Sequence, residues 1–515
     1  MLGLLLSACL STPRTLPPSP VEPSPPLPPI FEHFERRLAE PLSLQARYEY
    51  VSAAVQLARQ AQQEVWLDRL LERQSQRVAP DPLAYLFLFW WVDNALLTGA
   101  WQDAEQRLAL FEQQLLARPN AEQTQLLLME QPLSEYLHER RSVLLERTGQ
   151  LEAAYRLLAS RPLQSVALRS TLVPRQYRLA KQLLRDKRLL PMAFSTLEAP
   201  LVFPPRRFGP SLAVRPIEAL EFKAPWQAGI AQRAGVLAEY PGQTLVRTFT
   251  YGLSAESRAC GSWRGGYYYA AGTHARARHG GRDAYTIDFT AANRLRHRYG
   301  RGSFGIELRA AAAGLVWQAS YVTPTHEGAR SHRTQPENNR VDIYHVDLEH
   351  FRLSWVISEH ALGEGAREAI PRPLRLRDAW DYQTSYHHLA GIEGACAPGR
   401  QAREFPCIPR PALLSPGLLV WAGSPVGYED STGYSFSQHL HFRISQTCRP
   451  GGALCTQPLN QSHTGMSVPM HLEGRALRAQ DVGICLISTN TSPFEAWHEK
   501  LPTKQLLPSM PTIDP

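Results

Sequence analysis

The sequence predicts a multidomain α+β protein in which a helical part precedes a part built on an antiparallel β-sheet. The chain of 515 residues is longer than one ordinary domain, so we expect more than one. Apolar residues recur at helical spacing between residues 31 and 190. From residue 236 to residue 500 the apolar runs are short and alternate with loops rich in glycine, proline and polar residues, which is typical of strands.

Composition and charge fit a globular protein with a basic surface. The chain carries 55 Lys and Arg against 47 Asp and Glu, which gives a formal net charge of +8 at pH 7. Such a surface favours anionic partners, for example an acidic polymer or anionic lipid. No block of Lys and Arg with interleaved aromatic residues occurs, so we do not expect nucleic acid as a partner.

Residues 1–9 form a short apolar segment that ends in the sequence Leu-Ser-Ala-Cys. This ending resembles the lipobox of bacterial lipoproteins, in which the signal is cut before a cysteine that is then acylated. The resemblance implies a lipid anchor at Cys9 that holds the protein in the cell envelope, facing the periplasm, on the outer rather than the inner membrane. Residues 10–30 are rich in proline, and we expect them to form an extended tether.

Apolar spacing within the helical part, residues 31–190, indicates helix over residues 50–71 and over residues 83–97. The second segment is strongly apolar and contains Trp90 and Trp91. It is too short and too interrupted to cross a bilayer, so we expect it to pack in the core.

Two later segments of the helical part resemble each other. Each has a Thr-Gly pair and an alanine five residues after the glycine, namely Gly99 with Ala104 and Gly149 with Ala154. Glycine suits a turn between helices and alanine suits a close approach of helices, so the segments resemble tetratricopeptide-type hairpins. The repeats differ in length, and an irregular helical bundle explains them equally well. Either fold would bind a protein partner or position the C-terminal part.

Residues 191–235 are rich in proline and are expected to connect the helical part to a domain at residues 236–500. Strand signals dominate that domain, and their spacing predicts an antiparallel sheet with long loops. The expected strands are residues 244–250, 265–270, 284–289, 304–308, 314–320, 341–346, 382–389, 418–422 and 439–444.

Several histidines and a carboxylate lie on these predicted strands. Residues two apart on a strand share a face, so His439 and His441 are expected side by side. His388 ends another strand, and His279 precedes Asp288 by nine positions. Zinc binds neutral imidazoles and carboxylates in a tetrahedron, and a catalytic zinc site keeps one position for water. These segments therefore contain the donors of a zinc site.

The order of the motifs resembles that of the lysostaphin/LytM-type zinc metallopeptidases, which cut peptides of peptidoglycan. The resemblance extends from about residue 235 to about residue 472. Residues 348–379 form an insert that has no counterpart in the family, and residues 321–336 form another long loop. Both are expected to flank the substrate groove and to influence substrate choice. The matching features are Ile-Asp-Phe at 287–289, Gly-Ile-Glu-Leu at 305–308, Ala-Gly-Leu-Val at 313–316, Asn-Arg-Val-Asp-Ile-Tyr-His at 339–345, Tyr-x-His-Leu at 386–389, and Gly-x-Ser with His-Leu-His-Phe within 433–442.

By this resemblance, one zinc ion is bound by His279, Asp288 and His441. Asp283 competes with Asp288, because a His-x-Gly-x-Asp form also begins at His279. We favour Asp288, which has the flanking strand pattern, and keep His274 as an outside candidate for the first ligand.

The resemblance also implies the catalytic groups and the reaction. His388 and His439 would act as general base and as stabiliser of the oxyanion, with zinc-activated water as the nucleophile. The expected function is a zinc-dependent endopeptidase that cleaves cross-links or stem peptides of bacterial peptidoglycan. The alternatives are a catalytically inactive LytM-type lipoprotein that binds or activates cell-wall hydrolases, and a scaffold that acts through its helical part. No motif assigns a role to His326, His345 or His387.

Seven cysteines occur, and six of them lie in the C-terminal half. None forms a Cys-x-x-Cys pair, and an even set in one domain suits disulfides in an oxidising compartment. The six allow fifteen pairings. Proximity in the sequence suggests Cys448–Cys455 and Cys396–Cys407, which leaves Cys260–Cys485 by elimination.

Overall fold

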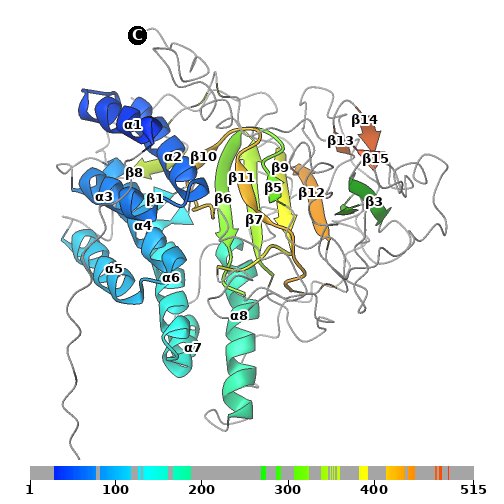
Figure 1. The fold of residues 1–515 in the computed structure, drawn as a ribbon. Helices are drawn as coiled ribbons and strands as arrows, with labels where there is room; N and C mark the ends of the chain where they lie inside the picture. Colours follow the sequence, from blue (N-terminus) through cyan, green and yellow to red (C-terminus); the bar gives the residue numbers. More distant parts are fainter. Residues whose placement is uncertain are drawn as a thin grey trace, which may run out of the picture.

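The computed structural model in Figure 1 shows a group of helices beside a β-sheet. The predicted signal segment with Cys9, nearly all of the tether, and the connector lie outside the described residues. So do the predicted strand at 244–250 and the side chains of all seven cysteines. The described residues are 28–76, 82–117, 126–128, 131–160, 166–186, 268–273, 286–291, 307–323, 338–345, 348, 351, 353, 356–359, 382–392, 413–433, 435, 439–446, 470–472, 475–477 and 485–486.

The helical part begins two residues before the predicted boundary, at Pro29, because proline is well suited to the first turn of a helix. The apolar stretch at 50–71 spans two helices, which separate where Gln62 adopts a φ of +56°. None of the described helices combines the length and the apolar character needed to cross a lipid bilayer. The helices are α1 (Pro29–Ala39), α2 (Leu44–Gln60), α3 (Glu64–Ser75), α4 (Pro82–Thr98), α5 (Trp101–Leu116), α6 (Leu133–Arg147), α7 (Leu151–Ser160) and α8 (Val166–Arg185).

The two Thr-Gly segments form matching turns between helices, α4 to α5 and α6 to α7. Gly99 and Gly149 have φ angles of +75° and +79°, a left-handed conformation that glycine adopts without strain. In both turns the residue after the glycine donates its N–H to the carbonyl five positions back, at 2.9 and 2.8 Å. Ala104 and Ala154 are fully buried. The helical hairpins are therefore confirmed, whereas their kinship with tetratricopeptide repeats stays a prediction.

Within the described residues, the main sheet has eight strands in the order β10-β6-β7-β9-β12-β4-β3-β15, and every neighbouring pair is antiparallel. This confirms the α+β class and the antiparallel sheet. The strands are β1 (Leu126–Leu128), β2 (Gln131–Pro132), β3 (Tyr268–Thr273), β4 (Ile287–Ala291), β5 (Glu307–Arg309), β6 (Gly314–Ser320), β7 (Arg340–His345), β8 (Ile357–Glu359), β9 (Tyr382–His387), β10 (Leu419–Val420), β11 (Pro425–Tyr428), β12 (Leu440–Gln446), β13 (Met470–Leu472), β14 (Arg475–Leu477) and β15 (Cys485–Leu486).

The central strands have one apolar and one polar face, as alternation along a strand requires. Ile343, Tyr386 and Phe442 lie on the apolar face and are fully buried. Asp342 and Ser385 lie opposite each other on the other face, and both are also fully buried. Burying polar groups is costly unless they have partners, and Asp342 has one in Arg340, whose Nη2 lies 2.9 Å from Oδ2 of Asp342.

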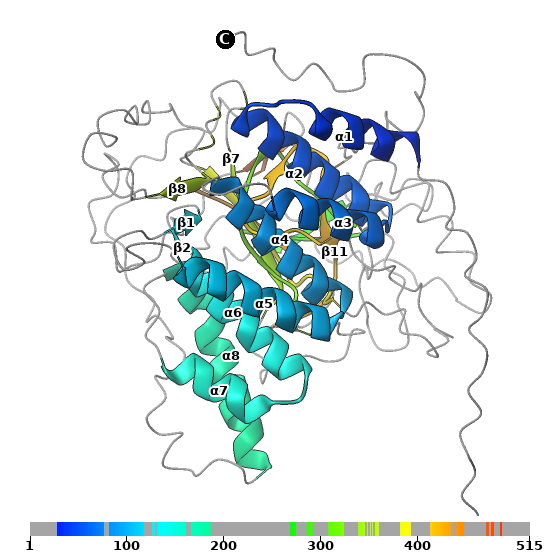
Figure 2. The same ribbon diagram turned by 90° about the vertical axis from the view of Figure 1, so that its left-hand side faces the viewer.

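The helical part packs against the β10 edge of the sheet and shares one hydrophobic core with it. Figure 2 shows α2, α3 and α4 in front of the sheet when the molecule is seen from the helical side. Tyr48, Gln56 and Arg59 on α2 donate to main-chain carbonyls of residues 413–419 at 2.7, 2.6 and 2.7 Å. Trp90 on α4 donates to another carbonyl of that segment at 3.0 Å. These bonds bury polar main chain together with its partners.

A small sheet forms a second link between the two parts. Strand β1 lies between α5 and α6 in the sequence, and it pairs with β2 and with β8, which belongs to the long segment between β7 and β9. This segment therefore reaches back to the helices, at least through β8. The proposed domain boundaries themselves stay a prediction.

The contact between the helical part and the sheet should be weakened by adding a side chain at Gly417. Its φ is +83°, and a Cβ at this position would lie 2.7 Å from Cδ1 of Leu128 and 3.1 Å from Cδ1 of Leu86. Gly417→Ala should lower the free energy of unfolding by about 2–4 kcal/mol, because strain and crowding add. Gly149→Ala is the matched control, since its φ is +79° and no atom would lie within 4 Å of a Cβ at that position. Urea unfolding should show a smaller loss, about 1 kcal/mol, for the control. Equal losses would contradict the proposed crowding.

A buried histidine outside the site makes stability depend on pH. The Nδ1–H of His345 donates to the Ala313 carbonyl at 3.1 Å, and Nε2 accepts from the Thr384 hydroxyl at 2.9 Å. Burial lowers the pKa of His345 to about 4. The unfolded chain therefore binds the proton first, so this contribution is complete above pH 6.5 and is lost as the pH falls from 6.5 towards 4. The loss should reach about 3 kcal/mol. Denaturant unfolding between about pH 7 and pH 4 measures how the free energy of unfolding depends on pH. His345→Gln should lose less stability over this range than wild type. An equal loss in both proteins would refute the assignment of this pH dependence to His345.

Candidate metal-binding site

The register around β12 brings together the polar groups of three strands. His441 on β12 lies directly opposite Asp288 on β4 and directly opposite His387 on β9. Cross-strand partners point to the same face of a sheet, and so does His439, two residues before His441. One carboxylate and three imidazoles therefore meet on the polar face.

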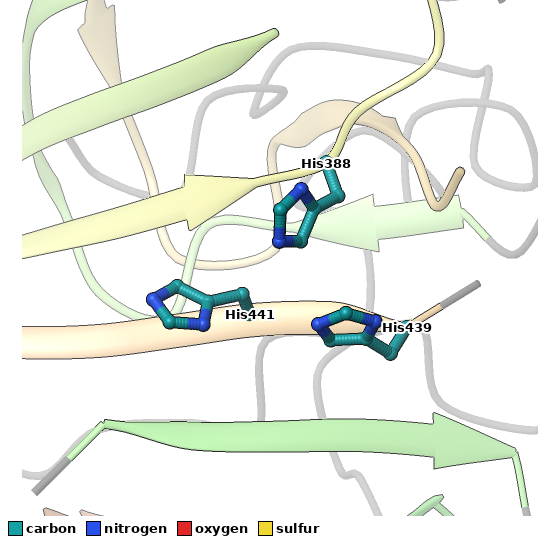
Figure 3. A group of neighbouring side chains, drawn as sticks. All are labelled: His388, His439 and His441. Carbon is teal, nitrogen blue, oxygen red and sulfur yellow. The ribbon is translucent and has the colours of Figure 1, made fainter. Parts of the chain in front are cut away.

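His388 joins this group through an unusual backbone conformation. It follows β9 directly and has a φ of +63°, which costs a residue with a Cβ about 1 kcal/mol or more. Its ring centroid lies 4.7 Å from that of His439 and 5.7 Å from that of His441. Figure 3 shows the three rings turned towards a common region. The backbone N–H of His388 donates to Oδ1 of Asn338 at 2.8 Å, which helps to hold the turn.

The donor atoms of this group have the spacing and chemistry of a zinc site. Ligand nitrogens of His388, His439 and His441 all lie within 4.8 Å of one another, so these residues can hold a metal ion. Oδ1 of Asp288 lies 3.0 Å from Nδ1 of His441 and 3.4 Å from Nε2 of His439. Two ligands bound tetrahedrally to zinc at about 2.0–2.2 Å lie about 3.3–3.6 Å apart. The 3.4 Å distance matches this spacing, whereas the 3.0 Å distance is that of a hydrogen bond between His441 and Asp288. The types of donor present, a carboxylate and imidazoles, fit a zinc ion.

The hydrogen bonding of His388 leaves one nitrogen available. Its Nδ1 lies 2.7 Å from the carbonyl of Thr432, which only accepts, so Nδ1 carries the proton and Nε2 has a free lone pair. Burial lowers the pKa of His388 well below its usual value, and the neighbouring His439 and His441 lower it further. The ring is therefore neutral near pH 7, as either a metal ligand or a general base must be.

Two further residues, His387 and Asn338, belong to this site although no sequence motif assigns them a role. The ring centroid of His387 lies 5.1 Å from that of His441. Nδ2 of Asn338 lies 2.8 Å from Nδ1 of His387. Burial lowers the pKa of His387 well below its usual value, and the charge of His441 contributes next. The alternation of β9, with polar residues at 383 and 385, was the available signal that His387 lies on the face of the site.

The remaining candidates are placed only in part. His279, Asp283, His274 and His326 lie outside the described residues, so their proposed roles stay predictions. Asp288 lies within the cluster. His345 is a packed histidine on the apolar side of the sheet, in agreement with the absence of a role for it.

Comparisons with known proteins add little to this geometry. No protein-family model matches the chain, and no curated protein matches it. Among solved structures, one match is a zinc-containing peptidase from Vibrio cholerae, with 14% sequence identity and a TM-score of 0.16. The match covers 35% of this chain and 31% of that one. A likeness of this size carries no argument about function.

Metal binding should depend on His441. We expect the full chain to bind about one zinc ion and His441→Ala to bind zinc at least about 100-fold more weakly, because a direct ligand is lost. His345→Gln is the control, since it removes a buried histidine that lies outside the cluster. Mass spectrometry of the dialysed protein gives the number of zinc ions bound, and competition with a chelator gives the affinity for zinc. Undiminished zinc in His441→Ala would remove this residue from the ligand set.

Proposed function

We propose that the chain is a zinc-dependent endopeptidase that cleaves peptides of bacterial peptidoglycan. The observation that carries the proposal is the group of Asp288, His388, His439 and His441 on the polar face of an antiparallel sheet. The order of sequence motifs, which resembles that of LytM-type metallopeptidases, supports the same activity.

In the proposed ligand set, Asp288 and His441 hold zinc together with His279. The register between β4 and β12 fixes the first two opposite each other. When bound, zinc lowers the pKa of a water molecule and polarises the carbonyl of the scissile bond. The role of the sheet is to hold the donors at ligand spacing before the metal arrives.

His388 and His439 are proposed to handle protons and developing charge. His388 presents an unprotonated Nε2 because Thr432 fixes its proton on Nδ1, so it can accept a proton as a general base. Nδ1 of His439 lies 3.3 Å from the hydroxyl of Ser435, which helps to orient this ring. His439 is then placed to donate a hydrogen bond to the oxyanion.

The substrate class and the location rest on the sequence. Peptidoglycan carries carboxylates, and the net charge of +8 suits an acidic polymer. A lipid anchor at Cys9 and a proline-rich tether would hold the enzyme at a membrane of the cell envelope, within reach of the wall. The helical part is proposed to bind a protein partner or to position the enzyme.

The test is digestion of purified peptidoglycan by the zinc-loaded full chain, with the released fragments identified by mass spectrometry. Wild type should release new peptide ends. His388→Ala and His439→Ala should keep zinc but lose turnover by about 100-fold or more, the usual scale for a lost acid–base group. His441→Ala, without zinc, should be inactive.

Three outcomes would count against parts of this proposal. Loss of zinc in His388→Ala with zinc retained in His441→Ala would mean that the ligand assignment is wrong. Normal digestion by all three variants would contradict the proposal that these histidines form the active site of an endopeptidase. No digestion by wild type, together with faster digestion by added cell-wall amidases, would favour an inactive lipoprotein that activates hydrolases.

A further inference from the structure

Neighbouring histidines at the end of β9 are held in opposite tautomers by one asparagine and one carbonyl. A backbone N–H can only donate, so the atom of Asn338 that lies 2.8 Å from the His388 N–H is its oxygen. The other end of the same amide is then the NH2 group, which lies 2.8 Å from Nδ1 of His387. Nδ1 of His387 is therefore an acceptor and carries no proton.

This tautomer decides what His387 can do. A neutral imidazole with an unprotonated Nδ1 carries its proton on Nε2 and can donate a hydrogen bond there. It has no lone pair on Nε2 with which to bind a metal. His388 is the reverse case, because its Nδ1–H is bonded to Thr432 and its Nε2 is free to accept. His387 thus lies beside the clustered histidines but cannot bind a metal through Nε2.

The Nε2 atom of His387 is buried, and it has no hydrogen-bond partner in the described part of the chain. A buried donor without a partner costs about 1–3 kcal/mol, and such groups usually have a functional reason or a missing partner. His387 lies on the same face as Asp288 and His441, on the β9 side of the cluster. An oxygen of a peptide bound beside the cluster would supply the acceptor that this donor lacks.

The support for His387 is rigid. Gly433 has a φ of +78°, and a Cβ there would lie 2.6 Å from Cβ of Asn338, so only glycine leaves room for this asparagine. The neighbouring Asn339 bonds to the main chain of Thr323 through both ends of its amide, at 2.8 and 2.7 Å. Asn338 is therefore packed against Gly433, and its neighbour Asn339 is held by two hydrogen bonds to the main chain.

We propose that His387 is a substrate-binding residue that donates its Nε2–H to an oxygen of the bound peptide, and that Asn338 is the positioning residue that sets this tautomer. The acceptor is a peptide carbonyl or a side-chain or terminal carboxylate, since both are oxygen acceptors present in peptidoglycan peptides. The inference rests on the proposed function for the identity of the ligand, whereas the tautomer does not depend on it.

The tautomer is tested first, on the zinc-loaded full chain labelled with 15N-histidine. The signals of His387 are assigned by their loss in His387→Phe. We expect Nδ1 to show the shift of an unprotonated nitrogen and Nε2 that of a protonated one. Asn338→Asp keeps the acceptor for the His388 N–H but replaces the NH2 donor by an oxygen, so Nδ1 should become protonated. A protonated Nδ1 in wild type would overturn the proposal.

The role in substrate binding is tested with soluble peptidoglycan peptides, by cleavage kinetics and by equilibrium binding. His387→Phe keeps a ring of similar size but has no donor, and it should lower kcat/KM about tenfold or more while zinc content stays the same. His387→Gln returns an N–H donor and should recover most of the loss. A kcat/KM within about twofold of wild type for His387→Phe, loss of zinc, or no recovery by glutamine would each refute the proposal.

Amidated peptides separate the two sources of the acceptor. If the loss in His387→Phe is confined to peptides with free carboxylates, the acceptor is a carboxylate. An equal loss on amidated peptides identifies a carbonyl. Binding separates this inference from the proposed function. Wild type that binds peptides but cleaves none contradicts the endopeptidase, and weaker binding by His387→Phe would still support the inference. Wild type that neither binds nor cleaves contradicts both.

Discussion

The register of β12 between β9 and β4 is the constraint on which the site depends. Because His441 lies opposite Asp288 on one side and opposite His387 on the other, a single strand sets three polar groups on one face. A shift by one residue would turn every side chain of β12 to the opposite face. Leu440 and Phe442, the apolar residues on either side of His441, are fully buried on the other face and prevent that shift. Core packing on one face therefore fixes the chemistry on the other.

Main-chain groups and a single amide then determine what each imidazole can do. The Thr432 carbonyl places the proton of His388 on Nδ1, and Asn338 leaves Nδ1 of His387 without one. Burial keeps the pKa of both rings low, so these assignments hold near neutral pH. Of these two adjacent histidines, His388 can therefore accept a hydrogen bond at Nε2, whereas His387 can donate one there. The left-handed turn at His388 is what allows both side chains to serve the same region.

The helices contribute to the fold at a distance from this site. They contact the β10 edge and residues 413–419, whereas the histidines lie on β9 and β12, beyond β6 and β7. Side chains of α2 and α4 donate to main-chain carbonyls of that segment, which would otherwise be buried without partners. The helical part therefore stabilises this edge of the sheet. Its own described surfaces offer no residue to the metal-binding group.

Local patterns in the sequence predicted the helical hairpins, most of the strands and four of the clustered residues, namely Asp288, His388, His439 and His441. Glycine at a turn, alternation along a strand and the His-Leu-His motif are local signals, and Gly99, Gly149, His439 and His441 carry them. Strands as short as β2 and β15, with two residues each, carry too few residues for such a signal. The roles of Asn338 and His387 depend on a hydrogen bond between residues 49 positions apart. Gly417 is crowded by Leu128 of β1 and Leu86 of α4, which precede it by hundreds of residues. Only the tertiary structure decides such contacts, because hydrogen-bond partners and proton positions follow from distances in space.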